Sequence, residues 1–282
     1  DYYASRGLGD VYKRQVFIYD IPSDKKPDII NFCYERMINI YINPDVCDLV
    51  ENVSEHYLLD DVSFLDHNVS NMTFEQRVIK RIFDIIFSLI FVVISSPIWI
   101  VSSIAIKLGD GGTVFFKQKR ATQYGRVFYV YKFRTMKEHV ENRSATSDDD
   151  RITKVGKVLR KTRLDEVPQL FNILKGDMSF VGPRPEMLEN VKSYTRELPE
   201  FKYRLRAKAG LTGYAQIAGK YNTSPKDKLI LDMMYIENYS FRTDIKLLFQ
   251  TAIVLLKKDS TEGFQKVSDC LECEKTPENL IN

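Results

Sequence analysis

Residues 85–106 read IIFSLIFVVISSPIWIVSSIAI, a run of 22 residues without a charged side chain. An uncharged run longer than about 18 residues predicts a membrane segment, because buried helices of soluble proteins seldom run so long without a charge. As one straight helix, the run extends roughly 33 Å, just enough to span the hydrocarbon core of a bilayer. The stretch therefore indicates a membrane-associated protein.

Ser96 and Pro97 interrupt this run near its middle. Proline removes a backbone hydrogen bond and clashes with the preceding turn, so it breaks or kinks a helix. Lys80 and Arg81 precede the run and further basic residues follow it, and positive charge favours the cytoplasmic side of a membrane. Two basic ends favour a re-entrant hairpin over residues 74–108, with two arms of roughly 16 Å that reach half-way into the bilayer and return. A Pro-kinked spanning helix is the alternative.

The charge of the chain changes sign near residue 73. Residues 16–73 carry 3 Lys/Arg and 11 Asp/Glu, whereas residues 74–220 carry 27 and 15, and the net charge of the whole chain is only +3. We expect the basic part to meet phosphates, nucleic acid or a lipid surface. The long uncharged run, together with the lack of a helix-turn-helix, zinc-finger or RNP-like motif, argues against nucleic acid.

The segments outside the basic part are assigned from local patterns. Residues 1–15 end in SRGLGDVYKRQ, which resembles translated sequencing-adapter sequence, so we expect a non-native leader. Residues 16–73 begin with an apolar run that predicts a buried parallel strand, followed by helical spacing over residues 29–40. This order predicts the C-terminal fragment of a Rossmann-like α/β domain. Residues 261–282 are a polar tail.

Residues 109–260 hold the candidate chemistry. Short apolar runs at 114–116 and 127–133 predict strands, and Thr153 is a suitable cap for a basic helix over 154–163. With the later helical patterns, this predicts a mostly helical α+β fold. The adjacent carboxylates Asp165 and Glu166 stand in RLDEVPQL, a weak signal taken alone.

Several ordered motifs accompany the carboxylates. Together they resemble the monotopic phosphoglycosyltransferases, bacterial sugar transferases that move a sugar 1-phosphate from a nucleotide sugar to polyprenyl phosphate. The matching motifs are Lys80-Arg81, Ser96-Pro97, FFKQ at 115–118, KFRTM at 132–136, DRIT at 150–153, the segment 164–170, GDMS at 176–179 and VGPRP at 181–185. The resemblance covers about residues 76–258, and the acidic leader resembles the linking domain of the family's long members, so we expect a truncated long form.

The resemblance implies a role for each candidate residue. Asp165 is expected to be the nucleophile that forms an aspartyl phosphosugar and expels UMP from a UDP-sugar, since an ionised carboxylate needs no base. Glu166 is expected to be a Mg²⁺ ligand or catalytic auxiliary, because cations offset the charge of the diphosphate. Arg184, fixed between two prolines, suits a bidentate phosphate contact, and Lys132, Arg134 and Arg163 are further phosphate partners.

The resemblance also implies a setting. It places the chain on the cytoplasmic face of the bacterial inner membrane, where polyprenyl (undecaprenyl) phosphate is the lipid acceptor and the reaction begins exopolysaccharide, capsule or O-antigen lipopolysaccharide synthesis. It selects no particular sugar and leaves homo-oligomers open. Ala209 departs from the family, which tends to have proline there. The rival interpretation is a non-catalytic, membrane-anchored scaffold for polysaccharide assembly.

Overall fold

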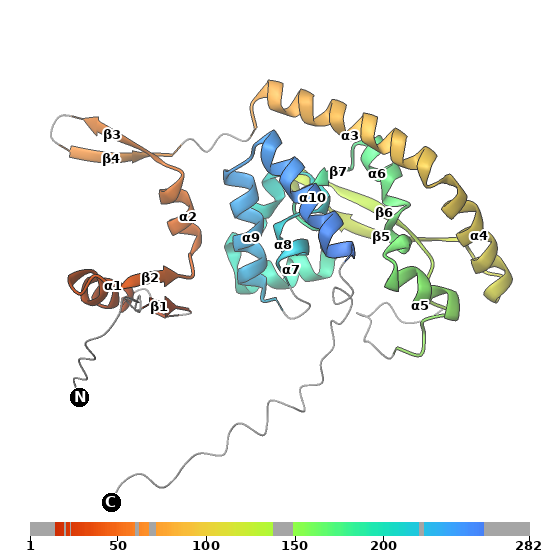
Figure 1. Cartoon of the computed structure of the whole chain (residues 1–282), viewed down its shortest axis with the longest axis horizontal. Coiled ribbons are helices and arrows are strands. Elements are labelled where there is room, and N and C mark those ends of the chain that lie inside the picture. The colour runs from red at the N-terminus through yellow and green to blue at the C-terminus, as the bar shows by residue number, and fades with distance from the viewer. Residues whose placement is uncertain are drawn as a thin grey trace, which may run out of the picture. The chain divides into compact units, whose positions relative to one another are not determined.

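The computed structural model describes residues 15–19, 21–22, 24–59, 62–67, 72–137, 149–219 and 223–256 (Figure 1). Residues 1–14 of the predicted leader and the whole of the predicted tail lie outside these ranges. Contacts divide the chain into two compact units, Asp1–Asn52 and Val53–Asn282. This division falls earlier than the change of charge near residue 73, so the acidic stretch belongs to both units.

The first unit is a β-α-β arrangement followed by a helix. Its elements are β1 (Gln15–Ile18), α1 (Lys26–Glu35), β2 (Asn39–Ile42) and α2 (Val46–Asn52). Strands β1 and β2 pair in parallel, which confirms that residues 15–18 form a parallel strand. The strand is not buried as predicted, because Ile18 is its only buried residue and Phe17 is 71% exposed. The helix expected over 29–40 is wrong at its end, because α1 stops at Glu35 and the Ile-rich residues that follow pair as a strand.

The second unit consists of helices around two small two-stranded sheets, β5–β6 and β7–β8, together with an exposed β3–β4 hairpin. Its strands are β3 (Glu55–Leu59), β4 (Val62–Asp66), β5 (Phe115–Ala121), β6 (Val127–Phe133), β7 (Met178–Val181) and β8 (Ala209–Thr212). Its helices are α3 (Phe74–Ile94), α4 (Ser96–Asp110), α5 (Lys154–Lys161), α6 (Gln169–Lys175), α7 (Leu188–Glu197), α8 (Tyr214–Ile217), α9 (Pro225–Glu237) and α10 (Phe241–Leu256). Short 3-10 helices are η1 (Gln123–Gly125), η2 (Leu164–Glu166) and η3 (Pro199–Arg206). This composition agrees with the predicted mostly helical α+β class.

Helices α3 and α4 contain the uncharged run and meet at a bend. No single helix among the described residues is long and apolar enough to cross a membrane. Within these residues, only α3 and α4 taken together have the necessary length and hydrophobicity, and they are bent by 58° where they meet. Ser95 lies at the break, where its hydroxyl donates to the Phe91 carbonyl (2.6 Å) and accepts from the Trp99 indole (2.9 Å). Pro97 stands in the first turn of α4, where a missing N–H costs nothing. The break is confirmed, but the arms do not fold back on each other as two antiparallel helices would.

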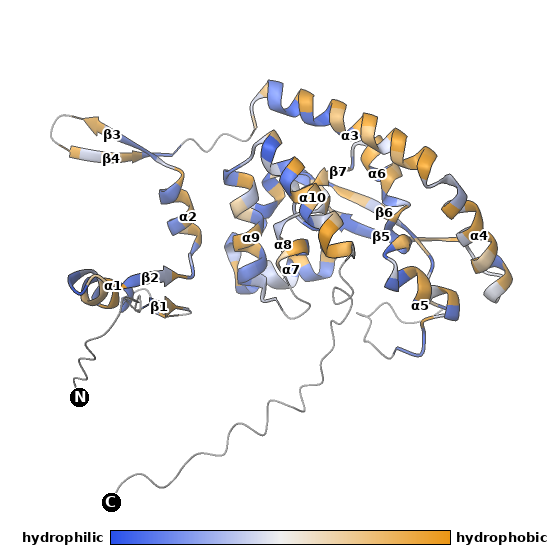
Figure 2. Ribbon diagram, viewed as in Figure 1, coloured by the Kyte–Doolittle hydropathy of each residue, from blue (hydrophilic) through white to orange (hydrophobic). Residues whose placement is uncertain are grey.

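A polar stripe on α3 faces the rest of the unit. Lys80, Asp84 and Ser88, spaced four residues apart, are all buried. The Lys80 ammonium lies 2.5 Å from the Asp244 carboxylate, and Asp84 accepts hydrogen bonds at 3.0 Å from the Ser179 hydroxyl and the Phe180 N–H. The opposite side of α3 and much of α4 expose hydrophobic side chains (Figure 2).

The two basic residues before the uncharged run, Lys80 and Arg81, both have partners within the protein. Lys80 has a side chain only 10% exposed and is paired with Asp244. Arg81 donates to the Ile173 and Leu174 carbonyls, both at 2.6 Å, where α6 ends. Both side chains are thus tied to the protein, and their membrane-flanking role stays a prediction.

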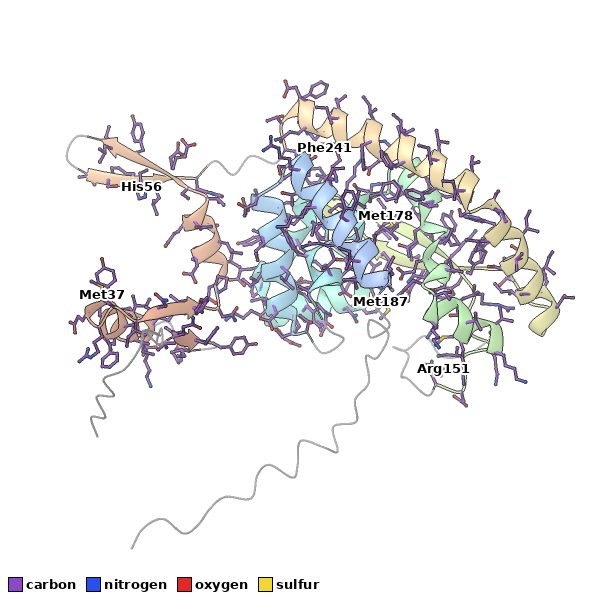
Figure 3. The ribbon with its side chains drawn as sticks, viewed as in Figure 1. Met37, His56, Arg151, Met178, Met187 and Phe241 are labelled. Atoms are coloured by element: carbon purple, nitrogen blue, oxygen red, sulfur yellow. The ribbon has the colours of Figure 1, made fainter. Side chains whose placement is uncertain are left out.

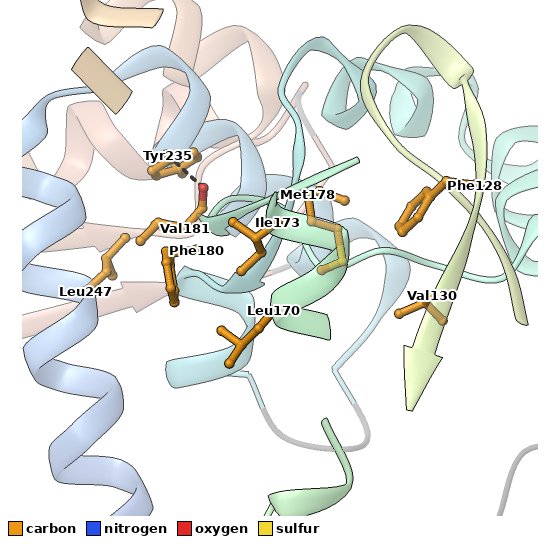
Figure 4. Packing of buried hydrophobic residues seen from close by; sticks show 10 residues of the cluster. Phe128, Val130, Leu170, Ile173, Met178, Phe180, Val181, Tyr235 and Leu247 are labelled. Carbon is orange, nitrogen blue, oxygen red and sulfur yellow. Dashed lines mark hydrogen bonds between the residues drawn. The ribbon is translucent and has the colours of Figure 1, made fainter. Parts of the chain in front are cut away.

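The core of the second unit lies between α6, β7 and α10 (Figure 4). Ile173, Met178 and Leu247 are fully buried in it, and Figure 3 shows Met178 in the interior. The Tyr235 hydroxyl lies 3.2 Å from the Val181 carbonyl and 2.9 Å from Asp244. The core thus fixes β7, which leads directly into the VGPRP segment.

Candidate active site

The two predicted carboxylates occupy η2, between α5 and α6. Thr153 caps α5 as predicted, its hydroxyl accepting from the Gly156 N–H (2.9 Å). After α5, Arg163 adopts φ +58°, a left-handed conformation that is costly for a residue with a side chain. This residue turns the chain, so that Asp165 and Glu166 emerge beside β6.

Glu166 is held by two cations. Its Oε1 lies 2.5 Å from the Lys132 ammonium and 3.3 Å from the Arg184 guanidinium. Burial acts to raise the pKa of Glu166, but Lys132 and Arg184 outweigh it and hold this pKa well below its usual range. Glu166 in turn raises the pKa of Arg184. Glu166 is therefore a fixed anion, and both ion pairs use the same oxygen.

Asp165 is held differently, although it is the adjacent residue. Within the residues that the structure describes, its half-buried carboxylate makes no hydrogen bond or ion pair. Burial and the Glu166 charge raise its pKa above the ordinary value of 3.8, while Lys132, Arg160 and Arg163 act against the shift. A carboxylate that is uncommitted yet surrounded by cations is suited to nucleophilic attack on an anionic phosphorus centre.

Arg184 reaches Glu166 from a tightly built loop. Gly182 and Gly210 bring two backbones together, since a Cβ on Gly182 would lie 2.3 Å from the Lys208 carbonyl and one on Gly210 would lie 2.1 Å from the Gly182 nitrogen. The two N–H groups donate to the Thr212 and Pro183 carbonyls at 2.9 and 2.8 Å. The glycines thus set the path of the backbone that presents Arg184.

Ala209, where the resemblance noted in the sequence implies proline, contributes to the same region. Its N–H donates to the Thr122 hydroxyl (3.1 Å), which itself donates to the Asp177 carbonyl (2.9 Å). Proline cannot make the first of these bonds. Alanine in place of proline at position 209 thus allows a hydrogen bond between β8 and the turn after β5.

A hollow opens beside Glu166. It is lined by residues of β5, β6, η2, α6 and the segments around β8: Arg120, Val130, Lys132, Glu166, Gln169, Arg184, Pro185, Gly210 and Leu211. Three of the residues predicted from sequence, Lys132, Glu166 and Arg184, meet here. The cationic lining suits a phosphate group, and Asp165 is the residue next to Glu166 in η2.

Two basic residues of this region, Arg120 and Arg160, were not predicted as active-site residues from the sequence. Arg120 donates to the Pro185 carbonyl (3.1 Å) and to the Gln118 amide oxygen (2.5 Å), and burial lowers its pKa to about 10, so it remains charged at neutral pH. The Gln118 amide in turn donates to the Met187 sulfur (3.1 Å), labelled in Figure 3. Arg160 donates to the Thr135 hydroxyl (2.8 Å) near Asp165. The FFKQ motif at 115–118, close to Arg120, was the sequence feature that could have indicated an active-site role for this arginine.

The remaining predicted phosphate partners are placed less favourably. Arg134 is only 6% exposed, and its backbone N–H donates to the Val114 carbonyl (2.9 Å). The structure does not bring its side chain to the open hollow, so its phosphate role stays a prediction. Arg163 is exposed and acts on both carboxylates through its charge.

The carboxylates were also tested as a metal site. In the part of the chain that the structure describes, no group of three His, Cys, Asp or Glu side chains comes together. Mg²⁺ is commonly bound by one or two carboxylates completed by substrate phosphates and water. Glu166 fits that kind of site through its second oxygen, since its printed contacts with Lys132 and Arg184 are both made by Oε1.

Comparison with known proteins identifies the family. The model of the bacterial sugar transferase family matches residues 75–258, and the chain belongs to this family. A UDP-N-acetylgalactosamine-undecaprenyl-phosphate N-acetylgalactosaminephosphotransferase of Aeromonas hydrophila is 40% identical over 63% of this chain and 44% of its own length. An undecaprenyl-phosphate galactose phosphotransferase of Salmonella typhimurium is 37% identical over 65% of this chain and 41% of its own length. An uncharacterized sugar transferase of Bacillus subtilis is 38% identical over 68% of this chain and 92% of its own length.

These relatives differ in length and in the sugar that they name. The chain spans less than half of the Aeromonas and Salmonella proteins and nearly all of the Bacillus protein. The shared part contains the uncharged run, the carboxylate pair and the Arg184 loop. The predicted family is confirmed.

Proposed function

We propose that this chain transfers a sugar 1-phosphate from a UDP-sugar to undecaprenyl phosphate, as the initiating step of exopolysaccharide, capsule or O-antigen synthesis. The names of its relatives support the substrate classes. The observation that carries the mechanism is the contrast within the carboxylate pair: Glu166 is neutralised by Lys132 and Arg184, whereas Asp165 is uncommitted.

The proposed reaction has two displacements. An Asp165 oxygen attacks the sugar-linked phosphorus, the bond from that phosphorus to the bridging oxygen breaks, and UMP leaves with the electron pair. An oxygen of undecaprenyl phosphate then attacks the same phosphorus, and the Asp165 carboxylate is released unchanged. The product is undecaprenyl diphosphate sugar, and no redox partner or net proton source is needed.

The cations around η2 make these steps feasible. Two anions must approach each other, and Lys132, Arg184, Arg163 and Arg160 offset that repulsion in a partly desolvated site. Glu166 keeps Lys132 and Arg184 in place. The second oxygen of Glu166, together with substrate phosphates, would hold Mg²⁺, which would supply further neutralisation of the diphosphate.

We also propose attachment to the cytoplasmic face of the inner membrane through α3 and α4. Support comes from the inward polar stripe and the outward apolar face, with Val101 67%, Ile104 53% and Leu108 83% exposed. Lys154, Lys157 and Lys161 are exposed on α5, which packs against α4 and would face anionic headgroups. If both arms make the same angle with the membrane plane, the 58° bend inclines each of them by about 29°. Arms of roughly 16 Å would then reach only about 8 Å into the bilayer, which is less than the half-way depth expected from the sequence.

The chemistry is tested by a UMP-release screen. Protein in nanodiscs is given Mg²⁺, undecaprenyl phosphate and each of a panel of UDP-sugars, including those named for the relatives. We expect UMP release with at least one sugar, and a covalent sugar-phosphate adduct by intact mass when the lipid acceptor is omitted. UMP release that needs the acceptor, with no adduct at any time, would contradict the two-step scheme; no UMP with any sugar would favour the scaffold interpretation.

The topology is tested separately. Single cysteines at Arg77 and Lys107, outside the two ends of the apolar run, are expected to label from the cytoplasmic side in spheroplasts and inverted vesicles. Labelling from opposite sides would show a spanning helix instead.

A further inference from the structure

The loop that carries Arg184 is held at three consecutive carbonyls. The Pro183 carbonyl accepts from the Gly210 N–H (2.8 Å), the Arg184 carbonyl from Arg204 Nη2 (2.7 Å) and the Pro185 carbonyl from Arg120 Nη1 (3.1 Å). Two of these donors are arginine side chains, which make charge-assisted hydrogen bonds. The Arg184 side chain itself is 44% exposed and points to Glu166. The loop is therefore fixed from behind, while its guanidinium stays available to a ligand.

Arg204 is more deeply buried than Arg120, the other arginine that donates to this loop. It lies on η3 with a side chain only 3% exposed, so it cannot touch a substrate in the hollow. The same Nη2 lies 2.7 Å from the Asp232 carboxylate on α9, which is 2% exposed. Arg204 therefore links the loop to α9 through one nitrogen.

Other charges complete this arrangement. Glu186 lies 3.9 Å from Arg204 Nη1 and 3.6 Å from the Lys228 ammonium. Burial raises the pKa of Asp232 to about 6, so at pH 7.5 the carboxylate is mostly ionised and pairs with Arg204. The guanidinium thus lies between two carboxylates at ion-pair distance, while its Nη2 donates to the Arg184 carbonyl.

We propose that Arg204 is a positioning residue that fixes the backbone of Arg184, so that the Arg184 guanidinium meets both Glu166 and a substrate phosphate. This inference rests on the proposed function, in which Arg184 contacts phosphate. Misplacing a phosphate contact by about 1 Å can cost roughly 100-fold in rate, so a buried residue behind the loop can affect catalysis without touching substrate.

The test is a double-mutant cycle. Arg204→Lys keeps the charge but cannot reproduce the fixed direction of a guanidinium hydrogen bond. We expect KM for the UDP-sugar that is most active in the screen to rise roughly tenfold, with KM for undecaprenyl phosphate changed less than twofold. In an Arg184→Met background, Arg204→Lys should add less than a twofold effect, because Arg204 acts through Arg184.

The matched control is Arg206→Lys. Arg206 lies on the same 3-10 helix and pairs with Glu237 of α9 at 2.6 Å. We expect its KM values to match those of the wild type. Asp232→Asn is the second variant, with a smaller rise in the donor KM that also disappears in the Arg184→Met background.

A readout independent of activity keeps this inference separate from the proposed function. Hydrogen exchange of the peptide covering residues 181–187 should speed up in Arg204→Lys and stay unchanged in Arg206→Lys, with both variants folded by circular dichroism. Unchanged exchange, or additive effects in the Arg184→Met background, would overturn the positioning role. An inactive wild type would refute the proposed function. The exchange result would still decide whether Arg204 fixes the backbone of Arg184.

Discussion

The charges beneath α3 and the charges around η2 are both taken out of bulk water, yet they are arranged differently. Beneath α3, Lys80 pairs with Asp244, and Asp84 accepts two hydrogen bonds. At η2, Glu166 has two cations and its neighbour Asp165 has no bonded partner in the described residues.

This difference distinguishes charges that stabilise the fold from a charge that can take part in a reaction. A buried charge with a well-placed partner has little tendency to react, and removing one partner leaves the other charge uncompensated. A partly buried carboxylate near cations but bonded to none keeps its lone pairs for an incoming electrophile. The first arrangement fixes the apolar helix to the unit, and the second is what a nucleophile requires.

The largest expected effect comes from Asp165→Asn. Loss of the nucleophile should reduce UMP release by roughly 10⁴-fold or more and abolish the adduct. Burial raises the pKa of Asp165, which means that the folded protein favours the protonated carboxyl over the ionised one. The protonated carboxyl therefore stabilises the fold below pH 3.8, and this stabilisation is lost as the pH rises through the raised pKa. The variant should therefore melt at or above the wild-type temperature at pH 7.5. A carboxylate-to-amide change at exposed Glu197 is the control, and an adduct that survives in Asp165→Asn would assign the nucleophile to another residue.

Breaking the pair beneath α3 should act on stability instead. Lys80→Met leaves Asp244 buried without its cation, which is expected to cost about 3–5 kcal/mol of unfolding free energy, measured by denaturation in detergent. Lys175→Met is the matched control, since Lys175 is 68% exposed and lies 3.6 Å from Asp177, and its loss should cost less than about 1 kcal/mol. Equal losses in the two variants would show that burial of the Lys80 pair is not what matters.

The pH dependence of the reaction sharpens the comparison further. Attack requires ionised Asp165, and its pKa is raised, so activity should fall about tenfold per pH unit below a midpoint above 3.8. Arg160→Met removes a cation that opposes this shift, and the acid limb should move to higher pH. The measurement is the single-turnover rate of adduct formation against pH; a limb that moves to lower pH in this variant would contradict the electrostatic assignment.

The smallest expected effect concerns Arg163. Its φ of +58° is a conformation that glycine adopts without strain, so Arg163→Gly should be more stable than Arg163→Ala by about 1 kcal/mol. Both variants lose the same cation beside Asp165 and should lose similar activity. Thermal melts of the pair measure the backbone term, and equal melting temperatures would show that the left-handed turn carries no strain.

Much of the site was accessible from the sequence because its residues lie in short, distinctive strings. Asp165, Glu166, Lys132 and Arg184 come from three separated motifs, and the structure brings them together as the family resemblance implied. The break in the uncharged run followed from Ser96 and Pro97, although the backbone breaks one residue earlier, at Ser95.

The features that the sequence could not show depend on partners far away in the chain. Lys80 reads as a membrane-flanking charge until Asp244, 164 residues later, is seen beside it. Arg134 was predicted as a phosphate partner from the KFRTM string, and that string gives no sign that the fold buries its side chain. The support behind Arg184 needs Arg204 and Asp232 from two further helices, and neither stands in a motif that suggests it.

The shallow bend between α3 and α4 carries a physiological consequence. On the attachment proposed above, the hairpin occupies the outer part of one leaflet and never meets the opposite one. Such a protein has no hydrophobic length to match, so acyl chains of 14 or 20 carbons should support it equally, unlike a helix that crosses. It would be free to work wherever its lipid acceptor gathers, in thick and thin regions of membrane alike.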